Sequence, residues 1–145
     1  MSSTYYTLLT GVQTQLQAIA GGPTVVLRKK LWVLEGDPSS MIVVAPGQAG
    51  EKIAELMFEG GVNWLYPVVV AYVNPIDKTL ALSQSIYNTR EAIRNALFTY
   101  FNGVISPAYD LEIDPEEVTE FAAAMSTNYD VTGFGMSYQT SETFD

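Results

Sequence analysis

The chain has 145 residues, of which 48% are hydrophobic and 16% are charged, and its formal net charge at pH 7 is −9. The apolar fraction excludes a disordered chain, and the charged fraction is below the ~25% that is typical of soluble domains. We therefore expect one folded domain over residues 1–145, with part of its surface reserved for other subunits. A tightly packed monomer would have the same composition.

Cysteine and histidine are both missing from the sequence. Their absence excludes disulfides, thiolate nucleophiles, serine–histidine arrangements and metal sites built on either residue. The first residues lack the pattern of a signal peptide, and no apolar run approaches the ~18 residues that suggest a membrane span. We expect a protein made in the cytoplasm that has no enzymatic activity and needs no cofactor or metal.

In chain order, the first expected element is an amphipathic helix from Tyr5 to Ile19. A strand is expected over Thr24–Leu34 and a second over Met41–Ala45, and the strong turn between them indicates a hairpin. The segment Lys52–Phe58 fits a helix or a strand by pattern alone. Because two glycines and another strand follow at once, we predict that it is a strand paired with Val62–Val73.

The segment Val62–Val73 is the most apolar stretch of the chain. Both faces of such a strand would be apolar, so we expect it to be covered on both sides. Pro67 has no N–H for a ladder, which predicts an edge, a bulge or a bend at that residue. A second long helix is then expected over Thr79–Phe101, with a buried stripe of Leu82, Ile86, Ile93, Leu97 and Phe101.

Three shorter elements are predicted near the end of the chain. The alternation of Tyr109–Asp114 indicates a strand, and Asp114 would cap a helix start at Pro115. Val118–Met125 fits a short helix or an irregular insert, and Tyr129–Thr140 fits a last strand. The order of elements predicts an α+β domain with two main helices packed on one side of a mostly antiparallel sheet.

Two groups of basic residues are candidates for contacts with a subunit or another partner. Arg28, Lys29 and Lys30 are three of the seven basic residues, and they share one short segment. Arg90 and Arg94 lie one turn apart on the second long helix, where Arg94 and Glu91 form an i,i+3 pair. Either group would suit an acidic neighbour, for example the C-terminal segment of another copy. Solvated charges that contact nothing are the alternative.

The negative charge is concentrated in the last part of the chain. Residues 106–145 contain nine acidic residues and no basic one, and residues 1–105 sum to zero. Asp110, Glu112 and Asp114 would project from one strand face, which favours a solvated or partner-facing acidic strip and repels phosphate backbones. A carboxylate-dependent hydrolase and a site for a hard cation are less favoured, because the three acids share one strand and no EF-hand loop is present.

Trp32, Trp64 and Tyr66 are candidates for an interface with another subunit. The alternative for these aromatic residues is a small apolar ligand bound between helices and sheet by a monomeric module.

Four segments, in this order, resemble the tail terminator and related neck proteins of long-tailed phages. They are Ser40–Gly47, Phe58–Ala71, Tyr87–Arg94 and Asn128–Gly133. The resemblance implies a virion protein that forms a ring, typically hexameric, between the head connector and the end of the tail tube. It implies as partners other copies of the chain, the tail tube protein, the head connector or adaptor protein, and DNA that passes through the ring without specific binding. A head–tail connector or stopper is the related alternative. One hypothesis is that the acidic strip lines the channel of the ring, where it would repel DNA and let it slide; a face for a partner is the alternative.

Overall fold

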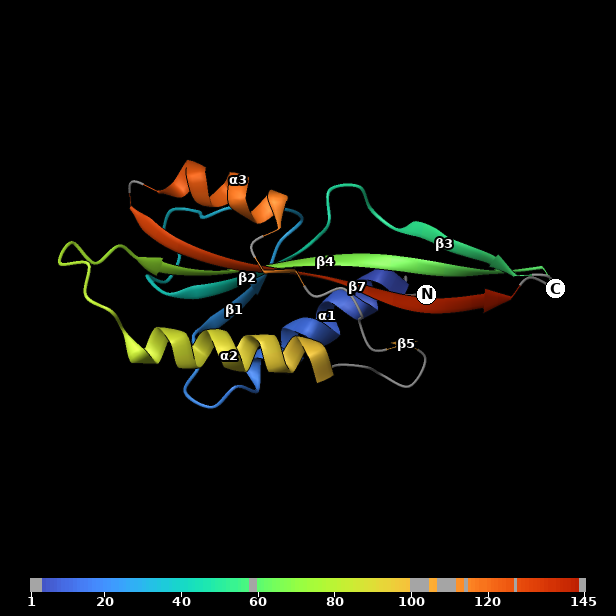
Figure 1. Cartoon of the computed structure of the whole chain (residues 1–145), viewed down its shortest axis with the longest axis horizontal. Helices are drawn as coiled ribbons and strands as arrows, with labels where there is room; N and C mark the ends of the chain where they lie inside the picture. Colours follow the sequence, from blue (N-terminus) through green and yellow to red (C-terminus); the bar gives the residue numbers. More distant parts are fainter. Residues whose placement is uncertain are drawn as a thin grey trace.

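Two strands of 15 residues form the centre of the molecule (Figure 1). The computed structural model describes residues 4–57, 60–99, 105–106, 112–113, 115–126 and 128–143. Strands β4 (Gly61–Pro75) and β7 (Tyr129–Thr143) pair antiparallel over their full length, from Gly61 opposite Thr143 to Pro75 opposite Tyr129. Of the other strands described, β2, β3, β5 and β6 pair with one of these two, and β1 is added through β2.

Around this pair, the described strands form one sheet in the order β1-β2-β4-β7-β5. Strand β3 also pairs with β4, and β6 also pairs with β7. The bounds of the shorter strands are β1 (Thr24–Leu27), β2 (Met41–Pro46), β3 (Lys52–Met57), β5 (Ile105–Ser106) and β6 (Glu112–Ile113). All described pairings are antiparallel except that of β1 with β2, which confirms an α+β fold with a mostly antiparallel sheet.

The predicted hairpin between the first two strands is wrong. Strand β1 ends at Leu27 and pairs parallel to β2, with Thr24 opposite Met41 and Leu27 opposite Val44. Residues 28–40 therefore form a long connection that returns the chain to the same end of the sheet. Parallel neighbours cannot be joined by a tight turn, so the turn that follows Leu34 lies inside this connection.

Strand β4 is covered on both sides over its second half, as its two apolar faces predict. Val68, Val70 and Tyr72 belong to one buried cluster, which also contains the buried residues of two helices. Val69, Ala71 and Val73 alternate with them and belong to a second cluster on the opposite face.

Pro67 lies within β4 at the place where its neighbour on one side changes from β2 to β3. Strand β2 ends with Pro46 opposite Val68, and β3 begins with Lys52 opposite Leu65. The Pro67 carbonyl accepts hydrogen bonds from the Gly47 amide and the Tyr5 hydroxyl on this side. Because the N and C=O of a strand residue point to the same side, the missing N–H faces this junction and removes no bond to β7.

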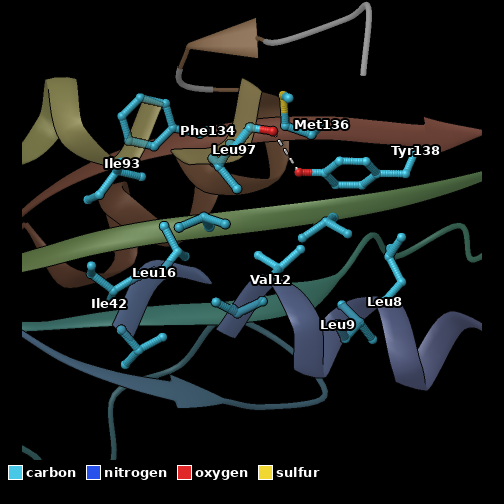
Figure 2. Packing of buried hydrophobic residues seen from close by; sticks show 14 of the residues in the cluster. Leu8, Leu9, Val12, Leu16, Ile42, Ile93, Leu97, Phe134, Met136 and Tyr138 are labelled. Atoms are coloured by element: carbon cyan, nitrogen blue, oxygen red, sulfur yellow. Dashed lines mark hydrogen bonds between the residues drawn. The ribbon is translucent and has the colours of Figure 1, made fainter. Parts of the chain in front are cut away.

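The two main helices pack on one side of the sheet, as predicted (Figure 1). Helix α1 (Thr4–Gln17) and helix α2 (Gln84–Thr99) cover one face, and helix α3 (Glu116–Met125) covers the other. Figure 2 shows the larger core, where Ile93 and Leu97 of α2 lie beside Phe134 and Tyr138 of β7, and the leucines of α1 join the same cluster on the side of β2. The buried hydroxyl of Tyr138 donates a hydrogen bond of 2.9 Å to the carbonyl of Leu97 in the last turn of α2.

Helix α2 begins at Gln84, five residues later than predicted. Asp77 accepts hydrogen bonds from the amide and the hydroxyl of Thr79 at 2.8 and 2.6 Å, and Leu80 has a φ of 57°. This turn excludes a helix there and leaves Leu82 82% exposed, so Leu82 is not part of the buried stripe. Ile93 and Leu97 are buried and Ile86 packs against them, whereas Phe101 lies outside the described residues.

Of the two alternatives predicted for Val118–Met125, the structure has the short helix, and Pro115 occupies the N-cap position of α3 without a capping side-chain bond. Asp114, the predicted cap, lies outside the described residues. None of the helices in the described part of the chain is long and apolar enough to cross a membrane.

Candidate interaction surfaces

Arg28 is engaged within the chain. Its guanidinium donates to both carboxylate oxygens of Asp37 at 2.7 and 2.6 Å and to the Trp32 carbonyl at 2.8 Å. Asp37 also accepts the Leu34 amide at 2.6 Å, so one carboxylate closes the loop after β1. The bonds from Arg28 lower the pKa of Asp37 to about 2. Arg28 is therefore a structural residue of this loop.

The rest of this basic segment borders a hollow against α3. Lys29 and Lys30 are exposed, and Trp32 is 46% exposed. Lys30 and Trp32, with Phe121 and Ala124 of α3, line a hollow of about 210 Å³. Its rim is both basic and acidic, because Glu117 and Glu120 also line it.

Trp64 and Tyr66 lie on the opposite face of the sheet from Trp32. Tyr66 is buried in the larger core, where its ring meets that of Tyr5 edge-to-face at 5.1 Å. Trp64 is half-buried against the same core. Because Trp32 lines the hollow beside α3, the structure does not bring the three aromatic residues together around one ligand.

Arg90 and Arg94 lie on the outer side of α2 in a row with two aromatic residues. The row consists of Tyr87, Arg90, Arg94 and Phe98, spaced three or four residues apart, and we call it the α2 stripe. Tyr87 and Phe98 are 51% and 48% exposed. The Arg90 guanidinium lies 5.0 Å from the centre of the Tyr87 ring, and Arg94 is 3.7 Å from Glu91, which confirms the predicted i,i+3 pair.

A hollow of about 250 Å³ lies along this stripe. Tyr87, Arg90, Glu91 and Arg94 line it from α2, and Phe134 lines it from β7. Two cations one turn apart thus border a recess with aromatic walls, a combination that suits carboxylates or phosphates.

Of the predicted acidic strip, the structure describes only part. Asp110 and Asp114 lie outside the described residues, and Glu112 is described as a backbone position in β6, opposite Gly135. The acidic surface that the structure does describe is α3, which carries Glu116, Glu117 and Glu120 and no basic residue. Glu117 accepts the Gln48 amide at 3.1 and 3.2 Å, whereas Glu116 and Glu120 are exposed one turn apart. Within the described residues, no cluster of three carboxylates suits a metal ion.

The most exposed apolar surface of the sheet lies at the end where β3 pairs. We call this end the arm, formed by Lys52–Met57, Gly61–Tyr66 and Tyr138–Thr143 (Figure 1). Ile53 lies opposite Trp64 and is 56% exposed, and Leu56 lies opposite Val62 and is 71% exposed. This places both side chains on the face of Trp64 and Val62.

Sequence reasoning found Arg90 and Arg94 but missed Tyr87, Phe98, Ile53 and Leu56 as surface residues. The spacing of the α2 stripe was available as a signal, because its members recur at three or four residues. The exposure of Ile53 and Leu56 had no such signal, since it depends on β3 lying at the edge of the sheet.

No known protein family matches this chain, and a search of curated proteins finds no relative. The functional argument therefore depends on the surfaces described above and on the sequence resemblance.

Proposed function

We propose that the chain is a structural subunit that assembles with copies of itself into a ring in the neck of a long-tailed phage. In this role it ends the tail tube and joins the tail to the head connector, and DNA passes through the ring. The observation that carries the proposal is the arm, whose outer strand exposes two large aliphatic side chains.

Strand β3 has six residues and, within the described part of the chain, pairs only with β4. An edge strand with exposed apolar side chains is a ready site for association. Strand β3 carries the charged residues Lys52 and Glu55, yet Ile53 and Leu56 remain exposed. Fully burying an aliphatic side chain of this size contributes ~1.5–3 kcal/mol, so contact with another copy at Ile53 and Leu56 would favour association substantially.

The virion role rests on the resemblance and agrees with the described surfaces. A ring of identical subunits needs head-to-tail contacts between different patches of each copy, and the arm differs from the surfaces around both α2 and α3. A net charge of −9 also suits a channel through which DNA slides without binding.

The test is the mass of the purified protein in solution, by light scattering over a concentration series, followed by imaging for a ring. We expect the wild type to form a closed oligomer with a central hole. The double variant Ile53→Glu/Leu56→Glu should remain monomeric with an unchanged circular dichroism spectrum, because charges on the arm oppose burial. The matched control is Leu80→Glu/Leu82→Glu, which adds the same charge at two leucines that are 84% and 82% exposed in a loop.

A wild type that stays monomeric at every concentration would refute the ring. Assembly of the arm variant at the wild-type concentration would remove the arm from the interface. Addition of the assembled protein to growing tail tubes then separates a terminator from a connector or stopper, because only a terminator halts polymerisation of the tube protein.

A further inference from the structure

We infer that the α2 stripe of one copy docks on helix α3 of the next copy, with Arg90 and Arg94 paired to Glu116 and Glu120. This inference deepens the proposed function, because it depends on self-assembly and names a contact that builds the ring.

The first argument is charge. Within the described residues, Arg90 and Arg94 are the two cations that lie one turn apart on a single helix, and they border a recess of about 250 Å³. Residues 106–145 carry nine of the sixteen acidic residues and no basic one, and α3 presents part of that charge on a regular element. A second copy therefore supplies the carboxylates that the stripe suits.

The second argument is spacing. Glu116 and Glu120 are exposed and separated by four residues, as are Arg90 and Arg94, so both pairs have the same rise along their helices. Like charges one turn apart repel each other within a helix, and docking the two helices relieves the repulsion on both.

The third argument is the apolar end of each row. The row on α3 continues from Glu120 to the exposed residues Ala123 and Ala124, and the α2 stripe ends in Tyr87 on one side and Phe98 on the other. Once the charges are paired, Phe98 lies against the alanines if the two helices run parallel, and Tyr87 does so if they run antiparallel.

The contact is heterologous. Helices α2 and α3 cover opposite faces of the same sheet (Figure 1), so each copy uses one patch to bind forward and another to bind backward. Such contacts form a ring when the rotation between successive copies closes on itself, as the proposed function requires.

Charge reversal tests the contact. Arg90→Glu/Arg94→Glu and Glu116→Arg/Glu120→Arg should each raise the concentration needed for assembly at least ~10-fold, because two ion pairs become two repulsions. An equimolar mixture of the two variants should assemble with both present, since each supplies the complement of the other. The variant with all four reversals should assemble alone. Lys78→Glu, which reverses the charge of an exposed lysine outside both helices, is the control and should assemble like the wild type.

Reversing Glu116 also places a cation at the start of a helix, which is unfavourable there. The single-residue variants Arg90→Glu, Arg94→Glu and Glu120→Arg avoid that position. Glu120→Arg should be rescued in the same chain by Arg94→Glu if the helices run parallel, and by Arg90→Glu if they run antiparallel. If assembly returns in the mixture or in the fourfold variant, the failure of each double variant alone cannot be due to misfolding, because the same substitutions are present.

The outcomes separate the two levels of the argument. A wild type that never assembles overturns the ring and this contact together. Assembly of the wild type and of both double variants at equal concentrations overturns only the contact. Loss of assembly in the arginine variant with normal assembly of the glutamate variant indicates another partner for the stripe and also overturns the contact. If the arginine variant assembles like the wild type but no longer binds double-stranded DNA, then DNA is the partner of the α2 stripe, and the proposed contact is again overturned.

Discussion

The carboxylate of Asp37 organises the connection between β1 and β2. It holds Arg28 through two hydrogen bonds and the Leu34 amide through a third, and the Arg28 and Asp37 side chains are only 18% and 11% exposed. A bidentate pair of this kind is more specific in geometry than an ordinary surface ion pair. Its effect is to fix the loop that carries Trp32.

We predict that Asp37→Asn lowers the free energy of unfolding at pH 7 by about 1 kcal/mol, a value discounted for contact with solvent. The pKa of Asp37 falls from 3.8 to about 2 on folding, so its contribution is complete above the unfolded-state pKa and is lost as the pH falls towards 2. Urea unfolding at several pH values measures this difference. It should be constant above about pH 5, shrink below that, and disappear only as the pH falls through about 2.

Glu35→Gln, at an exposed neighbour in the same loop, is the control and should show a much smaller difference. A difference between wild type and Asp37→Asn that persists unchanged to low pH would contradict the assigned role of the carboxylate.

For single residues, the sequence showed which charged residues cluster, but it did not show whether a cluster pairs within the chain or faces outward. Arg28 and Arg94 both belong to clusters, yet the first binds Asp37 nine positions away in a loop and the second lies on an exposed helix face. Helical spacing predicts neighbours on one surface, whereas a loop contact depends on a backbone path that no periodicity encodes.

Helix α3 packs very close to the sheet. It lies over β7 at Gly133, where an added β-carbon would be 1.9 Å from Cγ1 of Val118. At Gly135 the corresponding distance, to Cγ of Pro115, is 3.0 Å. The two glycines therefore allow the helix to pack directly against the strand.

We predict that Gly133→Ala destabilises the protein by ~3 kcal/mol, since the clash with a buried side chain forces α3 off the sheet. Gly135→Ala should cost clearly less. Chemical denaturation measures both. Val118→Ala, destabilising in the wild type, should cost less in the Gly133→Ala background because the two residues are in contact. Equal losses for the two glycine variants would show that close packing at Gly133 is not what seats the helix.

Hydrophobic pattern predicted most elements and failed where a local contact overrides it. The first helix, β2, β4 and β7 follow from periodicity and β-branched composition, whereas β3 was predicted from the two glycines and the strand that follow it. The early start predicted for α2 failed because Asp77 binds Thr79 and stops the helix pattern at Leu80. The hairpin prediction was wrong in direction. Strands that are neighbours in sequence usually lie side by side, and β1 and β2 do so, but they pair parallel and not antiparallel.

In the part of the chain that the structure describes, two apolar cores are separated by the sheet. The larger lies under α1 and α2 and the smaller under α3, and β2, β4 and β7 contribute to both. Because the same strands form the wall of each core, we expect the two to lose their structure together.

The two tryptophans allow a direct check, because Trp32 lies beside α3 and Trp64 beside the larger core. The variants Trp32→Phe and Trp64→Phe each keep one probe. After correction for the effect of each substitution on circular dichroism, their fluorescence transitions in urea should have coincident midpoints. An earlier transition at Trp32 would show that the α3 side unfolds separately.

The position of the tryptophans on opposite faces was not predictable from the chain. The number of helices on each side of the sheet was only partly predictable, because the short segment after Pro115 fitted a helix or an irregular insert equally well. Such facts depend on sheet order, and sheet order is set by pairings between residues far apart in the sequence.

The pairing of β4 with β7 has a consequence for synthesis on the ribosome. Strand β7, which pairs with β4 along its full length, is translated only after α2 and α3. Strand β4 therefore emerges from the ribosome long before its principal partner has been made. Contacts this distant in sequence form slowly and leave apolar segments open to misassembly in the meantime. Nascent chains stalled before Tyr129 are therefore the species most in need of a chaperone.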